Sequence, residues 1–386
     1  MAISEARPWR TFLLGLLLFW AVDTAIFGSG WYGPHQSPIL KTGDFWFTMT
    51  DVQQRPADPA RDVLVLGHSR MGEGFSFAQV QAEHLGGGLH FVSAIMPGSD
   101  FKWWYFQLRA LDPAGNRYRA VVIPVNGYLA RPDASSMKVA ADKGVGPALR
   151  PFLALRDWPA FIASFDTPGE RASALAVLLF PGHSLGVDAV SWLRSPGGRR
   201  AEIASRLALG LKARHEYQGY GAEDLSGLRF DYASCAVSAW PAQFDLFRQK
   251  DSQKYLCRPA DPAGETRMAE AYNRYWLQRI ADLYRGTHTR VIVVPVPAYG
   301  VAMAGVDPIA GAPDIRTGLA DAPQSPLLFL PEAPFAALAR RANFYDLVHM
   351  NRRGRTLFTR ALAGAVAQAL PGTTPPPPAA PPRPAP

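Results

Sequence analysis

Charged residues are scarce in this chain of 386 residues: they make up 19% of it, against 48% hydrophobic residues. This composition excludes a globally disordered protein, and the length predicts one elaborated domain or two small ones. The formal net charge is +8, yet Lys and Arg are scattered, with only short runs such as Arg199-Arg200. Because no basic stripe, RNA-binding signature or zinc-finger spacing is visible, nucleic acid is not an expected partner.

Metal-ligand spacings and phosphate-binding loops are missing as well. Four histidines are isolated in the sequence (His84, His90, His215 and His288), and the run Gly86-Gly87-Gly88 precedes a predicted strand rather than a helix. We therefore expect no metal and no other cofactor. Cys235 and Cys257 are too far apart for a C-x-x-C pair. In an oxidising compartment they could form a disulfide, and two unpaired thiols are the alternative.

One long apolar run, TFLLGLLLFWAVDTAIFG at residues 11–28, lies near the N-terminus. Asp23 is its only charge, and Arg7 and Arg10 precede it. The run is long enough to cross a bilayer, with the arginines inside and the rest of the chain exported. A cleaved signal peptide is the alternative, although no clean A-x-A cleavage site is visible. We expect a single-pass anchor in the inner (cytoplasmic) membrane and a main domain on the periplasmic side.

Short apolar runs alternate with helical patterns in the rest of the chain. Five runs are predicted as strands, at residues 62–66, 89–95, 119–125, 290–296 and 344–345. Helical patterns are predicted at residues 77–84, from Phe101 onward, and at residues 266–284, 336–342 and 353–370. This alternation predicts a parallel sheet with helices on both faces, that is, a flavodoxin-like three-layer α/β/α fold.

The domain organisation follows from these patterns and from a Trp-, Pro- and Arg-rich stretch that interrupts them. We expect a cytoplasmic N-terminus (1–10), a transmembrane anchor (11–28), a linker (29–61), a first α/β part (62–127), a largely helical insertion serving as a lid or partner surface (128–264), a second α/β part (265–370) and a disordered Pro-rich tail (371–386).

Polar and turn residues follow the predicted strands. Ser69, Gly98 and Asn126 follow the first three strands, and Asp346 and His349 follow the short last one. In parallel sheets the ligand lies beyond the carboxyl ends of the strands, so these five positions are expected to converge. A serine becomes a nucleophile when an imidazole takes its proton and a carboxylate orients that imidazole. N–H donors must also stabilise the oxyanion that develops.

In this pattern the chain resembles the SGNH (GDSL-like) hydrolases. The four letters map onto Ser69 in GHSR, Gly98 in MPGSD, Asn126 in VNG and His349 in DLVHMNRRG, in the family's order. The resemblance implies that Ser69 is the nucleophile, His349 the base and Asp346 its orienting acid. Ser69, Gly98 and Asn126 would form the oxyanion hole.

The resemblance spans residues 62–126 and 266–370 and departs from the family at one point, because Gly-Asp-Ser reads Gly-His-Ser here. Membrane-tethered, exported members of this kind commonly belong to systems that O-acylate cell-surface polysaccharides. The implied function is an O-acyltransferase or acylesterase acting on an envelope or secreted polysaccharide. An integral-membrane O-acyltransferase is a candidate partner. A non-catalytic accessory protein of such a system is the alternative.

Three residues near the predicted site are candidate substrate contacts. Arg70 could hold an anionic or carbonyl group of the substrate, with a structural salt bridge as the alternative. Trp103 and Trp104 could stack on a sugar ring, with core packing as the alternative.

A second serine motif, Gly182-His183-Ser184-Leu185-Gly186, matches the G-x-S-x-G nucleophile elbow of α/β-hydrolases. An α/β-hydrolase lipase or esterase that uses Ser184 is therefore a further alternative. Pro181 and the absence of an upstream oxyanion loop argue against it. We predict a turn there, after a run (residues 174–180) that could equally be a helix.

Overall fold

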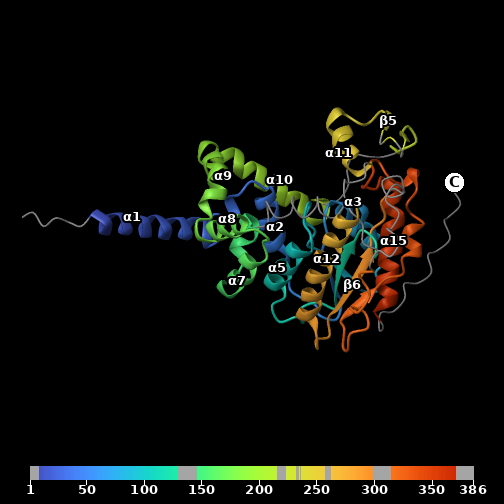
Figure 1. The fold of residues 1–386 in the computed structure, drawn as a ribbon, viewed down its shortest axis with the longest axis horizontal. Coiled ribbons are helices and arrows are strands. Elements are labelled where there is room, and N and C mark those ends of the chain that lie inside the picture. Colours follow the sequence, from blue (N-terminus) through green and yellow to red (C-terminus); the bar gives the residue numbers. More distant parts are fainter. Residues whose placement is uncertain are drawn as a thin grey trace, which may run out of the picture. The chain divides into compact units, whose positions relative to one another are not determined.

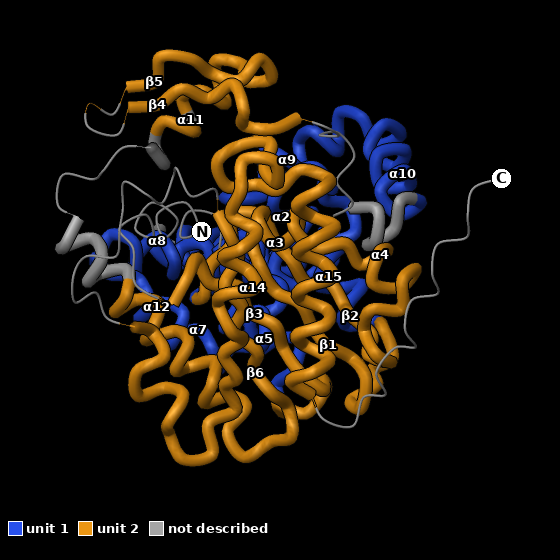
Figure 2. Tube along the Cα trace, turned by 90° about the vertical axis from the view of Figure 1, so that its right-hand side faces the viewer, with its two compact units in different colours: residues 1–54, 102–113, 138–210 blue, residues 55–101, 114–137, 211–386 orange. Residues whose placement is uncertain are grey.

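The computed structural model describes residues 8–128, 146–214, 223–231, 234, 236–256, 262–298 and 314–370. They form two compact units (Figure 2): unit 1 comprises residues 1–54, 102–113 and 138–210, and unit 2 comprises residues 55–101, 114–137 and 211–386. Arg7, the two cysteines and the Pro-rich tail lie outside the described residues, so the predictions for them stay predictions.

Unit 2 is built on a five-stranded parallel sheet (Figure 1). Its strands are β1 (Asp62–Val65), β2 (His90–Ser93), β3 (Ala120–Val125), β6 (Arg290–Pro295) and β7 (Leu327–Phe329). Their spatial order is β2-β1-β3-β6-β7, with every neighbouring pair parallel. This is a flavodoxin-like order, which confirms the predicted α/β class and places β1 and β3 at the centre.

Helices cover the sheet because its strands are apolar on both faces. Every residue of β1 and β3 is buried. On one face, alternate residues such as Val63 and Val65 join the core cluster of Phe358 and Leu362, which lie on α15 (Arg352–Ala369). On the other face α12 (Pro262–Tyr284) packs against β6. The prediction of a helix-covered parallel sheet is confirmed.

The fifth strand differs from the prediction. Phe344-Tyr345 is not a strand of the parallel sheet, since Phe344 forms only an isolated antiparallel bridge to Met350. The fifth strand is instead Leu327–Phe329, which pairs with β6. The four apolar residues between Pro326 and Pro331 are too short a run to predict a strand from periodicity. The consequence is that Asp346 and His349 lie in a loop closed by the Phe344 bridge rather than at a strand end.

The remaining elements of unit 2 are short. They are α3 (Ser69–Gly74), α4 (Phe77–Ala82), α11 (Leu246–Leu256), α14 (Ala333–Ala336), the 3-10 turn η5 (Arg341–Asn343), and an antiparallel pair formed by β4 (Arg229–Asp231) and β5 (Ala236–Ala239). Part of the expected insertion therefore belongs to the same unit as the sheet.

Unit 1 is helical. Its elements are α1 (Pro8–Asp23), η1 (Thr24–Gly28), η2 (Gly33–His35), α2 (Lys41–Gln54), α5 (Phe101–Leu111), η3 (Arg150–Phe152), η4 (Leu155–Asp157), α7 (Trp158–Ala163), α8 (Pro168–Leu179), α9 (Gly182–Arg194) and α10 (Pro196–Arg214). The expected linker at 29–61 thus contains α2, whose Phe45 and Met49 are buried. The helical character of the insertion is confirmed for residues 146–208.

Among the described residues one helix, Trp9–Gly28, is by itself long and apolar enough to cross a membrane (Figure 1). A membrane anchor and a signal sequence both have this composition.

Candidate active site

Ser69 is the first residue of α3 and follows a sharp turn that leaves β1. Gly67 in that turn has φ = +154°, and a Cβ there would lie 2.5 Å from Cβ of Met71. The position therefore requires glycine. The N–H of Ser69 donates to no other described residue. The turn thus presents both the hydroxyl and the backbone N–H of the serine at the carboxyl end of a central strand.

His68 occupies the position where the SGNH pattern has aspartate. Its Nδ1 accepts a hydrogen bond from the N–H of Arg70 at 3.2 Å, which caps α3. Burial, aided by the charges of Arg70 and His349, holds the pKa of His68 well below its ordinary value. The ring is therefore neutral, with its proton on Nε2. A neutral imidazole performs the capping for which Ser, Thr, Asp or Asn is usually found.

The loop that carries Asp346 and His349 is fixed at its far end by the start of α15. Asn351 caps that helix, since its Oδ1 accepts from the N–H of Gly354 at 3.0 Å. A Cβ at Gly354 would lie 2.1 Å from the carbonyl oxygen of Asn343, so the approach requires glycine. Asn351 and Gly354, which follow the Asp-x-x-His pair in the sequence, therefore hold the loop.

The structure brings Ser69, His349 and Asp346 together. His349 Nε2 lies 2.9 Å from Ser69 Oγ, and His349 Nδ1 lies 2.8 Å from Asp346 Oδ2. A carboxylate can only accept, so Nδ1 carries the proton and Nε2 is the acceptor for the serine hydroxyl. Asp346 Oδ1 also accepts from the N–H groups of Val348 at 2.9 Å and His349 at 2.7 Å. This arrangement can remove a proton from Ser69.

The electrostatic interaction between Asp346 and His349 supports that proton transfer. Burial disfavours the Asp346 carboxylate, but attraction to His349 and the hydrogen bonds it accepts outweigh burial and hold its pKa below the ordinary value. Burial likewise disfavours a charged His349, but the carboxylate of Asp346, with Glu73 acting in the same direction, raises the pKa of the imidazole. His349 is therefore a stronger base than an isolated histidine.

Glu73 and Tyr345 are site residues that the sequence did not reveal. Glu73 lies on α3, four residues after Ser69, and its Oε2 accepts from the Tyr345 hydroxyl at 2.8 Å. The Tyr345 ring stacks on the His349 ring, with centroids 5.8 Å apart and planes 16° apart. Burial raises the pKa of Glu73, although His349 and the tyrosine oppose this. The i, i+4 spacing of Ser69 and Glu73 would have been informative had α3 been recognised as a helix.

Gly98 is held beside the turn that carries Ser69. The N–H of Met96 donates to the carbonyl oxygen of Gly67 at 2.8 Å, and Ser99 Oγ lies 3.1 Å from the same oxygen. Gly98 itself has φ = +68°, which favours glycine. The loops after β1 and β2 are therefore tied together, as the shared sheet edge predicted.

Asn126 follows β3 on the other side of β1, and Arg70 orients it. Arg70 Nη1 donates to Asn126 Oδ1 at 2.9 Å. A guanidinium only donates, so the oxygen of the amide faces Arg70 and its NH₂ group faces away. The Arg70 side chain is 4% exposed. Arg70 therefore makes a positioning contact within the protein, and its contact with substrate stays a prediction.

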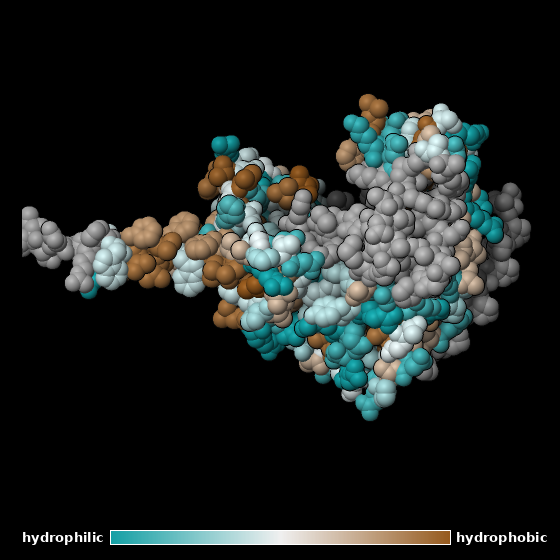
Figure 3. Space-filling model, in the orientation of Figure 1, coloured by the Kyte–Doolittle hydropathy of each residue, from teal (hydrophilic) through white to brown (hydrophobic). Residues whose placement is uncertain are grey.

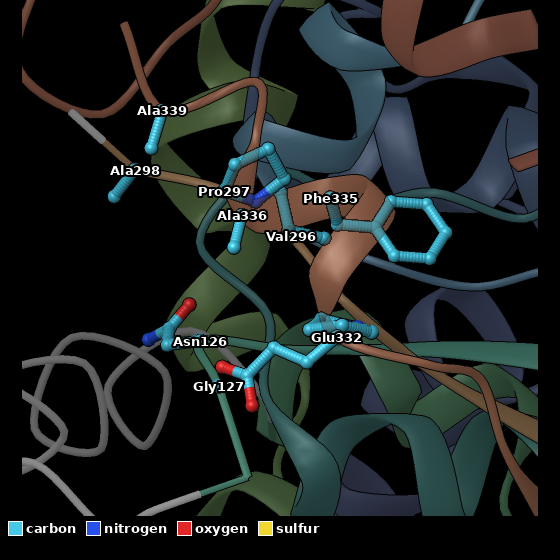
Figure 4. Close-up of a pocket in the computed structure, with 10 residues that line it drawn as sticks. Asn126, Gly127, Val296, Pro297, Ala298, Glu332, Phe335, Ala336 and Ala339 are labelled. Atoms are coloured by element: carbon cyan, nitrogen blue, oxygen red, sulfur yellow. The ribbon is translucent and has the colours of Figure 1, made fainter. Parts of the chain in front are cut away.

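A cavity of about 210 Å³ begins at Asn126 (Figure 4). It lies beyond the carboxyl ends of β3 and β6, and most of its lining is apolar. The lining residues are Asn126, Gly127, Pro295, Val296, Pro297, Ala298, Glu332, Phe335, Ala336 and Ala339. A small apolar group attached to a carbonyl at Asn126 could enter this space.

Trp103 and Trp104 do not form a sugar platform. Their side chains are 0% and 2% exposed and belong to the core of unit 1. The Trp103 ring packs edge-on against Phe45 at 5.4 Å, and Lys41 Nζ lies over its face at 4.4 Å. Core packing, which was the alternative, accounts for both tryptophans. The prediction that they contact substrate is wrong.

Ser184 does not lie on a nucleophile elbow. Such an elbow joins a strand to a helix. Here helix α8 precedes the motif, and Gly182 to Gly186 are the first residues of α9. The structure therefore lacks the strand-to-helix turn that the α/β-hydrolase alternative requires at Ser184, and the expected turn at this position is the first turn of a helix. The run before Pro181, for which a strand and a helix were both open, forms the end of helix α8.

Comparison with protein-family models and with curated proteins finds no match to this chain. The family resemblance consequently rests on the fold and on the residues at its edge. The five-stranded parallel sheet flanked by helices is consistent with an SGNH-like α/β fold.

Proposed function

We propose that this protein is an SGNH-type serine enzyme that transfers or hydrolyses acyl esters. The observation that carries the proposal is the continuous hydrogen-bonded series from Ser69 Oγ through His349 to Asp346. A hydroxyl, an imidazole and a carboxylate in this order form the apparatus of nucleophilic acyl transfer on unrelated folds. The departure from Gly-Asp-Ser to Gly-His-Ser does not remove any of the three groups.

The reaction follows from these contacts. His349 Nε2 takes the proton of Ser69 as Oγ forms a bond to the acyl carbonyl carbon. The tetrahedral intermediate then expels the alcohol, which receives that proton from His349, and an acyl-Ser69 ester remains. Water or a sugar hydroxyl attacks this ester while His349 accepts its proton. Departure of the acyl group regenerates Ser69, with His349 returning the proton to Oγ.

Three donors around Ser69 support stabilisation of the oxyanion. The N–H of Ser69, the N–H of Gly98 and the NH₂ group of Asn126 come from the ends of three adjacent strands. In this proposal the Arg70 bond to Asn126 Oδ1 directs that NH₂ group toward the carbonyl oxygen. Donors that are preorganised in this way need no rearrangement when charge develops.

The size of the acyl group and the identity of the acceptor are inferred from different observations. A short acyl chain fits the cavity of about 210 Å³ that starts at Asn126. The polysaccharide acceptor and an integral-membrane O-acyltransferase partner follow from the resemblance to membrane-tethered, exported SGNH proteins. We therefore propose a periplasmic enzyme, anchored in the inner membrane, that acts on an envelope or secreted polysaccharide.

The test uses the full chain in detergent with a chromogenic acetyl ester, with and without a soluble oligosaccharide acceptor. We expect acetyl release that disappears in Ser69→Ala, and acetylated oligosaccharide if transfer is the natural reaction. Circular dichroism checks that the variant is folded. If the wild-type protein releases no acetyl group from aryl or sugar esters, the enzyme proposal fails and the non-catalytic accessory protein takes its place.

A further inference from the structure

The C-terminal end of the apolar N-terminal helix is part of the folded unit 1. Asp23, the only charge in the run, is 7% exposed, and its two carboxylate oxygens lie 3.1 Å and 3.3 Å from the backbone nitrogen of Gly182. A Cβ at Gly182 would lie 2.1 Å from Asp23 Oδ1, so this approach requires glycine. An acidic group in an apolar span needs such a partner. Cleavage of the chain after Asp23 would remove this carboxylate from the protein.

The same end of the helix meets the corner between α8 and α9. Phe19 and Phe180 stack with ring centroids 6.1 Å apart. Phe19 lies nine residues before Gly28, the end of η1, which corresponds to about 13 Å along a helix axis. The corner therefore meets the helix well inside the length that a bilayer would cover.

An apolar crevice of about 660 Å³ is lined by both the helix and this corner. Its walls are mostly aromatic and aliphatic. The lining includes Leu16, Phe19, Phe27 and Phe180, together with the polar side chains of Asp23 and His183. Because one wall is the apolar helix itself, the crevice is continuous with the surface that faces lipid if that helix spans a membrane.

The α8–α9 pair also exposes apolar side chains. Together the two helices are as apolar as a membrane span, with a bend of 51° between them. Val187 is 86% exposed and Leu193 68% exposed, and Leu175 and Val190 are exposed as well. Figure 3 shows hydrophobic residues gathered along α1 and around α8 and α9. Large exposed patches of this kind mark a protein or membrane contact.

The exposed charged residues of the pair stand at its outer ends, while Asp188 within α9 is buried and paired with Arg199. Arg171 lies in the first turn of α8 and Arg194 ends α9, and both are exposed. At the corner Pro181 is buried, Phe180 is half-buried against Phe19, and His183 is exposed. This distribution suits a helical hairpin whose exposed apolar side chains, such as Val187, enter the acyl chains while its arginines remain among the head groups.

We propose that α1 is retained in the mature protein and that the α8–α9 corner is inserted into the bilayer leaflet from which α1 emerges, with lipid acyl chains in the crevice. The Gly-His-Ser-Leu-Gly motif then serves to attach the corner to Asp23. This inference rests on α1 crossing the membrane, as proposed above, and is independent of catalysis at Ser69.

The test measures quenching of an environment-sensitive fluorophore by spin-labelled phospholipids in nanodiscs of phosphatidylethanolamine and phosphatidylglycerol. Single cysteines replace Leu17, Val187, Leu193 or Asp282 in the full chain, with Cys235 and Cys257 changed to serine. Leu17 reports on the span, and Asp282, which is exposed on α12, is the aqueous control. We expect loss of most emission at Val187 and Leu193 with lipids labelled high on the acyl chain, and no loss at Asp282.

The outcomes separate the two claims. Quenching at Leu17 but not at Val187 and Leu193 would overturn the inserted corner while leaving the anchor intact. A blue-shifted but unquenched emission at Val187 would assign this face to a protein partner and would equally overturn it. If Leu17 is also unquenched, the membrane anchor itself is wrong. Intact-mass measurement of the membrane-extracted protein must show residues 1–28, and a form that begins after Asp23 would contradict retention.

Discussion

The chain contains the tripeptide Gly-His-Ser twice, and the two copies differ in the elements that precede them and in the contacts that they make. Gly67-His68-Ser69 follows the buried strand β1, and its serine lies 2.9 Å from an imidazole that a carboxylate orients. Gly182-His183-Ser184 follows helix α8, and its glycine N–H binds Asp23. The second copy is the closer match to a well-known catalytic motif. The role of such a motif depends on the element that precedes it. It also depends on which residues from distant parts of the sequence the fold places beside it.

The largest expected effect separates the two serines. His349→Ala should lower kcat/KM for an acetyl ester by about 10⁶-fold, because loss of one triad member removes the whole unit. Ser184→Ala should leave kcat/KM unchanged. Steady-state kinetics on both variants checks this, with thermal melting as the control for folding. Equal losses in the two variants would mean that the comparison between the motifs is wrong.

A smaller effect is expected at the oxyanion donors. Asn126→Ala should lower kcat by about 10²- to 10³-fold, as expected for one donor to an oxyanion. Arg70→Met should lower kcat less, because Arg70 acts through Asn126. The double variant should resemble Asn126→Ala alone, since the two residues act as one unit. Additive losses in kcat would show that Arg70 has a separate role.

The smallest effect concerns pH. His349 must be neutral to accept a proton, so kcat/KM should fall as the pH drops through its raised pKa. Glu73 contributes to raising that pKa, and Glu73→Gln should therefore lower the pKa of His349. The acidic limb of the pH profile of kcat/KM should then move to lower pH. An unchanged limb, or a shift to higher pH, would contradict the role assigned to Glu73.

Much of the fold was predictable because buried parallel strands have a strong signature. The runs around β1, β3 and β6 are continuous apolar segments bounded by turn residues, and all three were predicted within one or two residues. The strand β7 was missed since Leu327–Phe329 is only three residues long. Unit 1 was poorly predicted because α2 and the insertion helices assemble from segments far apart in the sequence.

The candidate site was predictable where it depends on strand ends. Ser69, Gly98 and Asn126 follow adjacent strands, so the topology alone brings them to one edge. The contacts of Glu73 and Tyr345 could not be predicted, because they depend on a six-residue helix and on the folding of one loop over it. The role of Arg70 toward Asn126 also required side-chain geometry.

Labelling with a serine-reactive fluorophosphonate, followed by peptide mapping, tests the central claim most directly. The account predicts one adduct, on Ser69, that is lost in His349→Ala and retained in Ser184→Ala. An adduct on Ser184, or no adduct on the folded wild-type protein, would contradict it.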